Sequence, residues 1–106
     1  MSPPRTKDEL KDQAREWSGK LGVAVKTITV RPMSRKWASW STLGNLTLNE
    51  ELLTFRVEVS DYVIVHELLH DQAPNHGKLW KSLMRAHLGD YEHVEQELRQ
   101  SANNGS

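Results

Sequence analysis

The sequence predicts an α+β fold, in which one helix is followed by three strands and then by three further helices. Three patterns in the chain support this prediction. Apolar residues recur at helical spacing near the N-terminus, β-branched residues and alternation dominate residues 23–49, and helical spacing returns from about residue 60. The 106 residues suit one domain with a modest core. We therefore expect a single domain over residues 1–106, with flexible ends at 1–5 and 101–106.

The first predicted helix begins just after Thr6 and ends at Gly22. Thr6 and Glu9 have the spacing of a capping box, and glycine is a common residue at the C-terminal end of a helix. Between these signals, apolar residues recur three or four positions apart: Leu10, Ala14, Trp17 and Leu21. This stripe predicts a scaffold helix with one face packed on the core.

Three strands are predicted next. Residues 23–31 are rich in β-branched side chains and stop at Pro32. Residues 36–42 and 45–49 predict the second and third strands, and the Leu-Gly-Asn sequence between them is typical of a hairpin turn. Residues 50–55 are ambiguous and are compatible with a short helical turn.

A His-Glu-x-x-His motif, formed by His66, Glu67 and His70, lies inside a strongly apolar run. On a helix, residues four apart lie on one face, so both imidazoles can hold the same metal ion. Glu67 lies about 100° further round the helix, where its carboxylate can act as a general base without occupying a coordination position. We predict a helix over about residues 60–72, capped by Ser60 or Asp61.

The alternative interpretation of this motif is an amphipathic helix with two surface histidines. The neighbouring side chains are apolar on nearly all sides of the predicted helix, so the helix should be buried. Polar groups on a buried helix need partners, and a metal ion is an effective partner for two imidazoles. The pattern therefore favours a metal site.

A third ligand is needed, because catalytic zinc usually has three protein ligands and one open position. Pro74 disfavours further helix, so the chain can turn back and bring His76 to the same ion. Alternatively, Asn75 caps the next helix and His76 merely opens it. Glu92 or Glu95, from the last predicted helix, is the competing third ligand.

Two helices are predicted at the C-terminal end. Helical spacing runs over residues 76–88 and stops at Gly89, and a last helix is expected from about Tyr91 to Gln100. We expect His87 and His93, which lie in these helices, to be structural or exposed rather than metal ligands.

Composition excludes several classes of function. Lys plus Arg and Asp plus Glu number 14 each, so no strong basic field exists and autonomous nucleic-acid binding is not expected. The chain has no cysteine, which excludes thiolate zinc sites and leaves histidine and carboxylate as ligands. No apolar run is long enough to span a membrane, and the first thirty residues lack a signal-peptide core. The default expectation is a soluble cytoplasmic protein.

Two blocks of the sequence resemble a known family. Residues 35–49, Arg-Lys-Trp-Ala-Ser-Trp-Ser-Thr-Leu-Gly-Asn-Leu-Thr-Leu-Asn, resemble an Arg-Trp-Gly-Ser-Cys-Ser hairpin followed by Gly and a strand ending Leu-Asn. Residues 61–70, with Asn75, His76 and Trp80, resemble Val-His-Glu-Leu-x-His, then Asn-His, then Phe-Trp. Both blocks are similar to those of the small zincin-like metallopeptidases of the YgjP-like and SprT-like (WLM) group. They cover most of the domain, although alanine and tryptophan at 38 and 40 replace the usual glycine and cysteine.

This resemblance implies a minimal zincin-like fold with a small, mainly antiparallel three-stranded sheet and an active-site helix. It implies one Zn²⁺ per chain, held by His66, His70 and His76, with Glu67 as general base in a zinc-dependent metalloendopeptidase. The substrate would be a peptide or protein, extended along an exposed strand of the hairpin. The alternatives are a latent or non-catalytic zinc-stabilised binding module and a DNA-repair-associated SprT-like protease.

Other roles stay open at the level of sequence. No spacing argument selects the residue that would help to stabilise the oxyanion, for which Tyr62, Tyr91, Arg35 and Arg85 are candidates. Asp71 could orient a ligand histidine through a hydrogen bond, or it could be a solvated surface residue.

Overall fold

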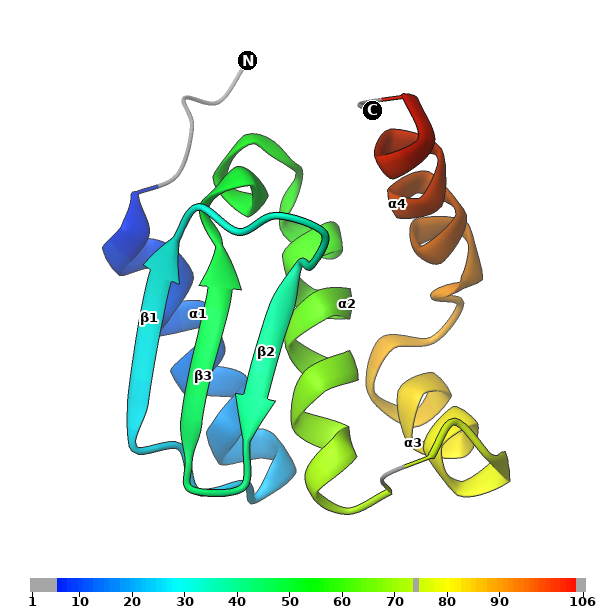
Figure 1. Ribbon diagram of the computed structural model, residues 1–106. Coiled ribbons are helices and arrows are strands. Elements are labelled where there is room, and N and C mark those ends of the chain that lie inside the picture. The colour runs from blue at the N-terminus through cyan, green and yellow to red at the C-terminus, as the bar shows by residue number, and fades with distance from the viewer. Residues whose placement is uncertain (1–5, 74, 105–106) are drawn as a thin grey trace.

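The computed structural model describes residues 6–73 and 75–104, and it describes side chains as far as residue 100 (Figure 1). The chain forms α1 (Lys7–Leu21), β1 (Thr27–Arg31), β2 (Ala38–Ser41), β3 (Asn45–Asn49), the 3₁₀ turn η1 (Glu50–Thr54), α2 (Val57–Leu68), the 3₁₀ turn η2 (Leu69–Asp71), α3 (Lys78–Leu88) and α4 (Glu92–Asn104). The predicted flexible segment 1–5, the predicted breaker Pro74 and the end of the predicted tail, 105–106, lie outside the described residues.

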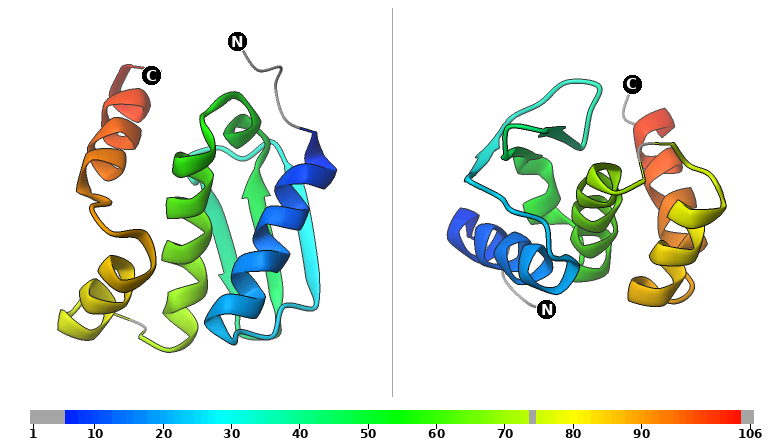
Figure 2. Two further views of the ribbon diagram at one scale, coloured as in Figure 1. Left: turned by 180° about the vertical axis from the view of Figure 1, so that it is seen from behind. Right: turned by 90° about the horizontal axis from the view of Figure 1, so that it is seen from below.

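Helix α2 is the centre of the molecule. Helices α1 and α2 lie side by side on one face of the sheet, and α3 and α4 lie on the side of α2 away from α1 (Figures 1 and 2). Because α2 is covered on all these sides, its apolar side chains form the middle of the core, with no exposed surface at Val59, Ile64, Val65 and Leu68. The predicted burial of the motif helix is therefore confirmed. No helix in the described part of the chain is both long and apolar enough to cross a membrane.

Helix α1 follows its sequence signals closely. The Thr6 hydroxyl accepts a hydrogen bond from the Glu9 backbone N–H at 3.1 Å, and the Glu9 carboxylate accepts one from the Thr6 N–H at 2.9 Å. Gly22 adopts a left-handed conformation with φ of 69°, which glycine tolerates without strain. The capping box and the predicted helix end are confirmed.

The sheet has the strand order β1-β3-β2. Strands β2 and β3 form the predicted antiparallel hairpin, but β1 pairs with β3 in parallel, so the sheet is mixed rather than mainly antiparallel. The strand predicted over 23–31 begins only at Thr27, because its partner β3 begins at Asn45 and the preceding residues have no strand to pair with. The hairpin residue Gly44 accepts hydrogen bonds from the backbone N–H groups of Lys26 and Thr27.

The predicted start of the motif helix is wrong. Helix α2 begins at Val57, three residues earlier, with Arg56 at the N-cap and no side-chain cap hydrogen bond. Ser60 is fully buried inside the helix. Asp61 accepts hydrogen bonds from the Gln13 side chain and the Trp17 indole N–H, both at 2.7 Å, and so ties α2 to α1. Both predicted caps are used in tertiary packing instead.

The two C-terminal helices differ from prediction at three of their ends. Gly77, not Asn75, occupies the N-cap of α3, which starts at Lys78, two residues later than predicted. The helix ends at Leu88 with Gly89 at the C-cap, as predicted. Helix α4 starts at Glu92, one residue late, and continues to Asn104, so residues 101–104 are helical where a flexible tail was predicted. The polar residues there do not interrupt a helix, and the first glycine comes only at position 105. Residues 50–54 form the ambiguous helical turn.

Candidate metal centre

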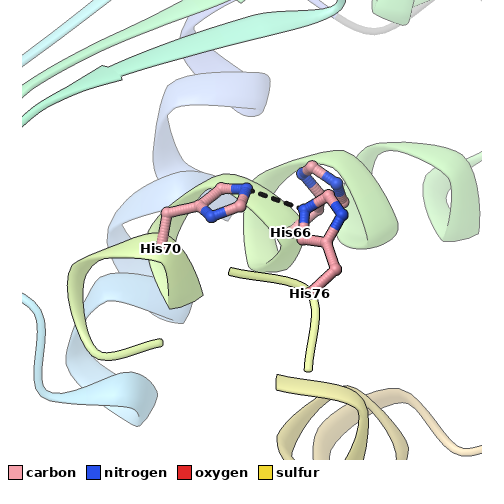
Figure 3. Close-up of side chains that lie close together, drawn as sticks. All are labelled: His66, His70 and His76. Atoms are coloured by element: carbon pink, nitrogen blue, oxygen red, sulfur yellow. Dashed lines mark hydrogen bonds between the residues drawn. The ribbon is translucent and has the colours of Figure 1, made fainter. Parts of the chain in front are cut away.

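Three histidine side chains converge beside the C-terminal end of α2 (Figure 3). One ring nitrogen from each of His66, His70 and His76 lies within 4.8 Å of the other two, and the His70 and His76 Nε2 atoms are 3.1 Å apart. Two nitrogens bound tetrahedrally to one zinc ion lie about 3.3 Å apart, given Zn–N bonds of about 2.0–2.1 Å. The donor set and its spacing therefore fit one metal ion held by three imidazoles.

Local structure explains how the three rings meet. His66 lies in the last turn of α2, and His70 lies in η2, where the α-helix tightens into a 3₁₀ turn after Leu68. The predicted α-helix to about residue 72 is therefore too long, although the two rings remain 5.0 Å apart between centroids. His76 comes from the segment between η2 and α3, and its ring lies with those of His66 and His70, as predicted.

Trp80 forms one wall of the cluster. Its ring centroid lies 4.4 Å from that of His76, 5.2 Å from that of His66 and 6.5 Å from that of His70. Trp80 is in the first turn of α3 and is only 3% exposed. A buried indole against three imidazoles limits the positions that their rings can take, and it holds the exposed His76 toward the other two.

The competing third ligands are occupied elsewhere. The Glu92 carboxylate pairs with Arg85. The Glu95 carboxylate accepts hydrogen bonds from the Tyr62 hydroxyl at 2.9 Å and from Arg99 at 3.0 Å. Within the described residues, the histidine, cysteine and carboxylate groups close enough to share a metal ion are the three histidines.

Glu67 lies next to His66 on α2 and lines a cleft of about 410 Å³ that reaches the metal centre. Burial raises the pKa of the Glu67 carboxyl to about 7, and the positive charge of Lys36 opposes part of this rise. Burial, together with the neighbouring His70 and His76, lowers the pKa of His66 to about 4. At neutral pH His66 is therefore uncharged, which is the form that binds a metal.

The cleft is built from three parts of the chain that are distant in sequence. One wall comes from the residues before and at the start of β2, including Lys36 and Trp37, and its floor comes from α2, including Val63. Helix α4 supplies the opposite wall with Leu98 and Arg99. Helix α4 is tied to the α2 region at two points. Glu97 forms an ion pair with Arg56, the N-cap residue of α2, at 2.6 Å. Glu95 accepts a hydrogen bond from the hydroxyl of Tyr62, which lines the cleft.

The residues left open by the sequence have different surroundings. Tyr62 lines the cleft, and burial with the Glu95 hydrogen bond raises the pKa of its hydroxyl above the usual range. Tyr91 is buried and stacks on Tyr62 at 6.0 Å, while Arg85 is engaged with a glutamate. Arg35 is exposed in the segment before β2.

The remaining polar candidates lie outside the three-histidine cluster. Asp71 is exposed at the end of η2. His87 is exposed and packs edge-on against Trp17 at 6.1 Å, and His93 is also exposed.

Sequence reasoning misses three residues of the site region. It assigns Lys36 only to a strand, and no periodic pattern marks a lysine that lines the same cleft as a carboxylate on α2. It considers Glu95 only as a metal ligand, not as the acceptor for Tyr62. It treats Asn49 only as the end of a strand, although this residue is 3% exposed. A buried asparagine indicates an internal hydrogen-bond network. The residues that it bonds to are fixed by the tertiary structure and cannot be read from the sequence.

Comparison with known proteins agrees with this fold. The family model described as YgjP-like, metallopeptidase domain, matches residues 3–101. The metallopeptidase zymogen jannalysin of Methanocaldococcus jannaschii has a TM-score of 0.76 and 28% identity, over 87% of this chain and 95% of that chain. The metallopeptidase zymogen abylysin of Pyrococcus abyssi has a TM-score of 0.74 and 20% identity, over 89% of this chain and 95% of that chain. A sequence comparison with curated proteins gives no match. Since the family model spans nearly all of the sequence, the chain belongs to the family of YgjP-like metallopeptidase domains.

Proposed function

We propose that this protein is a zinc-dependent metallopeptidase, in which His66, His70 and His76 hold one Zn²⁺ and Glu67 is the general base. The observation that carries the proposal is the convergence of three ring nitrogens within 4.8 Å, beside a cleft that Glu67 lines. An all-nitrogen site fits zinc best among the common metal ions.

The zinc ion that His66, His70 and His76 would hold would supply an activated water molecule and a Lewis acid for the substrate carbonyl group. Glu67 accepts a proton from the attacking water and later donates it to the leaving amine. Its burial supports this role, because a carboxylate whose pKa is raised toward 7 accepts a proton more readily than a solvated glutamate.

The peptide substrate would lie along β2. This strand is at an edge of the sheet, since β3 pairs with it on one side only and β1 lies beyond β3. The residues at the start of β2 line the cleft. An extended peptide can add to such an edge through backbone hydrogen bonds and pass close to Glu67.

Metal analysis of purified protein tests the ligand set. Wild type should contain about one zinc per chain, and His76→Ala should lose it or bind it much more weakly. His87→Ala, which removes an exposed histidine outside the cluster, is the matched control and should keep its zinc. Zinc retained at full occupancy in His76→Ala would transfer the third-ligand role to Glu95 or Glu92.

The general base is tested separately. Glu67→Gln should retain zinc while hydrolysis of a peptide library falls by several orders of magnitude, because an amide cannot accept the proton. Undiminished hydrolysis by Glu67→Gln would refute the assignment.

A latent form of the same peptidase is the second candidate. Jannalysin, at 28% identity, is a metallopeptidase zymogen. In this chain α4 forms one wall of the cleft and is held to the α2 region by the Tyr62–Glu95 hydrogen bond and the Arg56–Glu97 ion pair. If the protein is latent, Tyr62→Phe combined with Arg56→Ala should increase peptidase activity without changing zinc content.

A further inference from the structure

Two cations, Lys36 and Arg99, and two carboxylates, Glu67 and Glu95, line the cleft, and of these Arg99 and Glu95 form an ion pair. Glu95 is paired with Arg99 and also accepts the Tyr62 hydroxyl, so its charge is largely satisfied within the wall. Lys36 lines the same cleft, and no carboxylate in the described part of the chain lies within ion-pair distance of its ammonium group. Under the proposed function Glu67 is used in the chemistry, which leaves Lys36 as a cation available to a ligand.

Lys36 lines the same cleft as Glu67 and His66. Apolar side chains line the same cleft, including Trp37 and Leu98. A charge beside apolar walls interacts more strongly with a bound ion than a charge that is surrounded by water.

The backbone that carries Lys36 is held by a buried asparagine. Asn49 is 3% exposed, and its side-chain amide donates hydrogen bonds to the carbonyl oxygens of Met33 and Lys36, at 3.1 and 2.9 Å. The Asn49 backbone N–H donates to the Trp37 carbonyl at 2.9 Å. This arrangement keeps Arg35 in a left-handed conformation with φ of 67°, which is unfavourable for a residue with a side chain.

The backbone at Lys36 is fixed more firmly than that of an ordinary surface lysine. Three hydrogen bonds to Asn49 and one left-handed residue determine where the Lys36 side chain leaves the backbone, at the mouth of the cleft. Only the outer part of the side chain remains free to move, so little backbone entropy is lost when a ligand binds the ammonium group.

We propose that Lys36 is a specificity-determining residue, positioned by Asn49, which selects peptides that carry a carboxylate close to the scissile bond. This inference rests on the proposed peptidase function. The carboxylate is either the side chain of an acidic residue or the free C-terminus of a short peptide, and both would pair with the ammonium group in the same way.

Paired peptides test the proposal. Each pair is identical except for Glu or Gln at one position beside the cleavage site, and each peptide is made with a free or an amidated C-terminus. The zinc-loaded enzymes are wild type, Lys36→Met, Lys36→Glu and the control Lys26→Met, which removes an exposed lysine just before β1. The readout is the ratio of kcat/KM between the members of a pair, so differences in folded fraction cancel.

Wild type and Lys26→Met should prefer the carboxylate peptide by about fivefold at low ionic strength, and the preference should fall as salt is added. Lys36→Met should show no preference, and Lys36→Glu should prefer the neutral peptide. If the Glu/Gln ratio carries the effect, the ligand is an acidic side chain; if the free/amidated ratio carries it, the ligand is the C-terminus. Equal cleavage within all pairs by wild type, or a preference that survives in Lys36→Met, would overturn the proposal.

A binding measurement separates this proposal from the proposed function. Fluorescence anisotropy of the same labelled peptides is measured with zinc-loaded Glu67→Gln, with and without Lys36→Met. A carboxylate preference in binding that depends on Lys36 supports the inference even if wild type hydrolyses none of the peptides, and in that case only the peptidase assignment fails. Hydrolysis without any charge preference would support the peptidase assignment and refute the proposed role of Lys36.

Discussion

Replacing Glu67 by glutamine should stabilise the metal-free protein at neutral and alkaline pH. The folded-state pKa of this carboxyl is about 7, against 4.5 for a solvated glutamate side chain. Between these values the folded state binds more protons than the unfolded state, so the contribution of Glu67 to stability falls as pH rises from about 4.5 to 7. The glutamine side chain of the variant does not ionise and has no such dependence.

The magnitude follows from the same two pKa values. Their difference corresponds to about 3.4 kcal/mol at 1.36 kcal/mol per pKa unit. Because the Glu67 side chain is partly exposed in the cleft, solvent screening reduces this figure, and we expect a gain of about 2 kcal/mol. The gain should be near zero at about pH 4 and reach its full size above about pH 7.

Urea unfolding of chelator-treated wild type and Glu67→Gln, from about pH 4 to about pH 8.5, measures this difference directly. His66 adds an opposite term in both proteins, because its folded-state pKa is lowered to about 4 and its contribution to stability is lost as pH falls below about 6.5. Taking the difference between the two proteins removes that term. Glu16→Gln, at an exposed position on α1, is the control.

Two curves that run parallel across this pH range would refute the claim that burial in the folded protein raises the Glu67 pKa. A second comparison uses zinc-loaded proteins. A nearby dication favours the ionised carboxylate, so zinc should reduce the advantage of Glu67→Gln above about pH 7. An advantage of unchanged size would place the metal too far from Glu67 for the proposed chemistry.

Three further predictions concern the framework of the site. Asp61→Ala should lower the free energy of unfolding by about 2 kcal/mol in urea titrations, because it leaves the Trp17 indole and the Gln13 amide without their carboxylate acceptor; Asp12→Ala, on the exposed side of α1, should have little effect. Asn49→Ala should cost about 2–3 kcal/mol in the same assay, since three side-chain hydrogen bonds are lost, yet zinc stoichiometry should stay at one per chain. Removing zinc with a chelator should lower the free energy of unfolding by on the order of 4 kcal/mol if free zinc exceeds Kd by about 1,000-fold, and scanning calorimetry should show the loss reversed by added zinc.

Local signals in the sequence are sufficient for much of the fold. The capping box at Thr6, the stop at Gly89 and the hairpin at Gly44 each depend on residues close in sequence, and each is found where it was predicted. The parallel pairing of β1 with β3 was missed, because nothing in either strand specifies which edge of the hairpin β1 will join. The early start of α2 was missed because Asp61 bonds to a distant helix instead of capping its own.

The candidate site also combines features that local sequence predicts with features that only the tertiary structure determines. The His-Glu-x-x-His spacing and the turn after η2 are local features, and the three histidines come together as predicted. Whether they bind zinc stays a prediction. The charge and shape of the cleft depend on Lys36, Trp37 and α4, which approach α2 only in the folded chain. No spacing rule connects these segments, so sequence reasoning could not describe the substrate-binding surface.

The apolar run around the motif carries more information than the five-residue motif itself. A surface helix with the same spacing would keep both imidazoles and the carboxylate in water, near their ordinary pKa values. Here the apolar neighbours make α2 the core of the protein, and that burial lowers the pKa of His66 to about 4 and raises the pKa of Glu67 to about 7. The free-energy cost of burying these groups is offset by the same core that surrounds them. The sequence feature that places α2 at the centre of the fold therefore also prepares a neutral ligand and a stronger base at its C-terminal end.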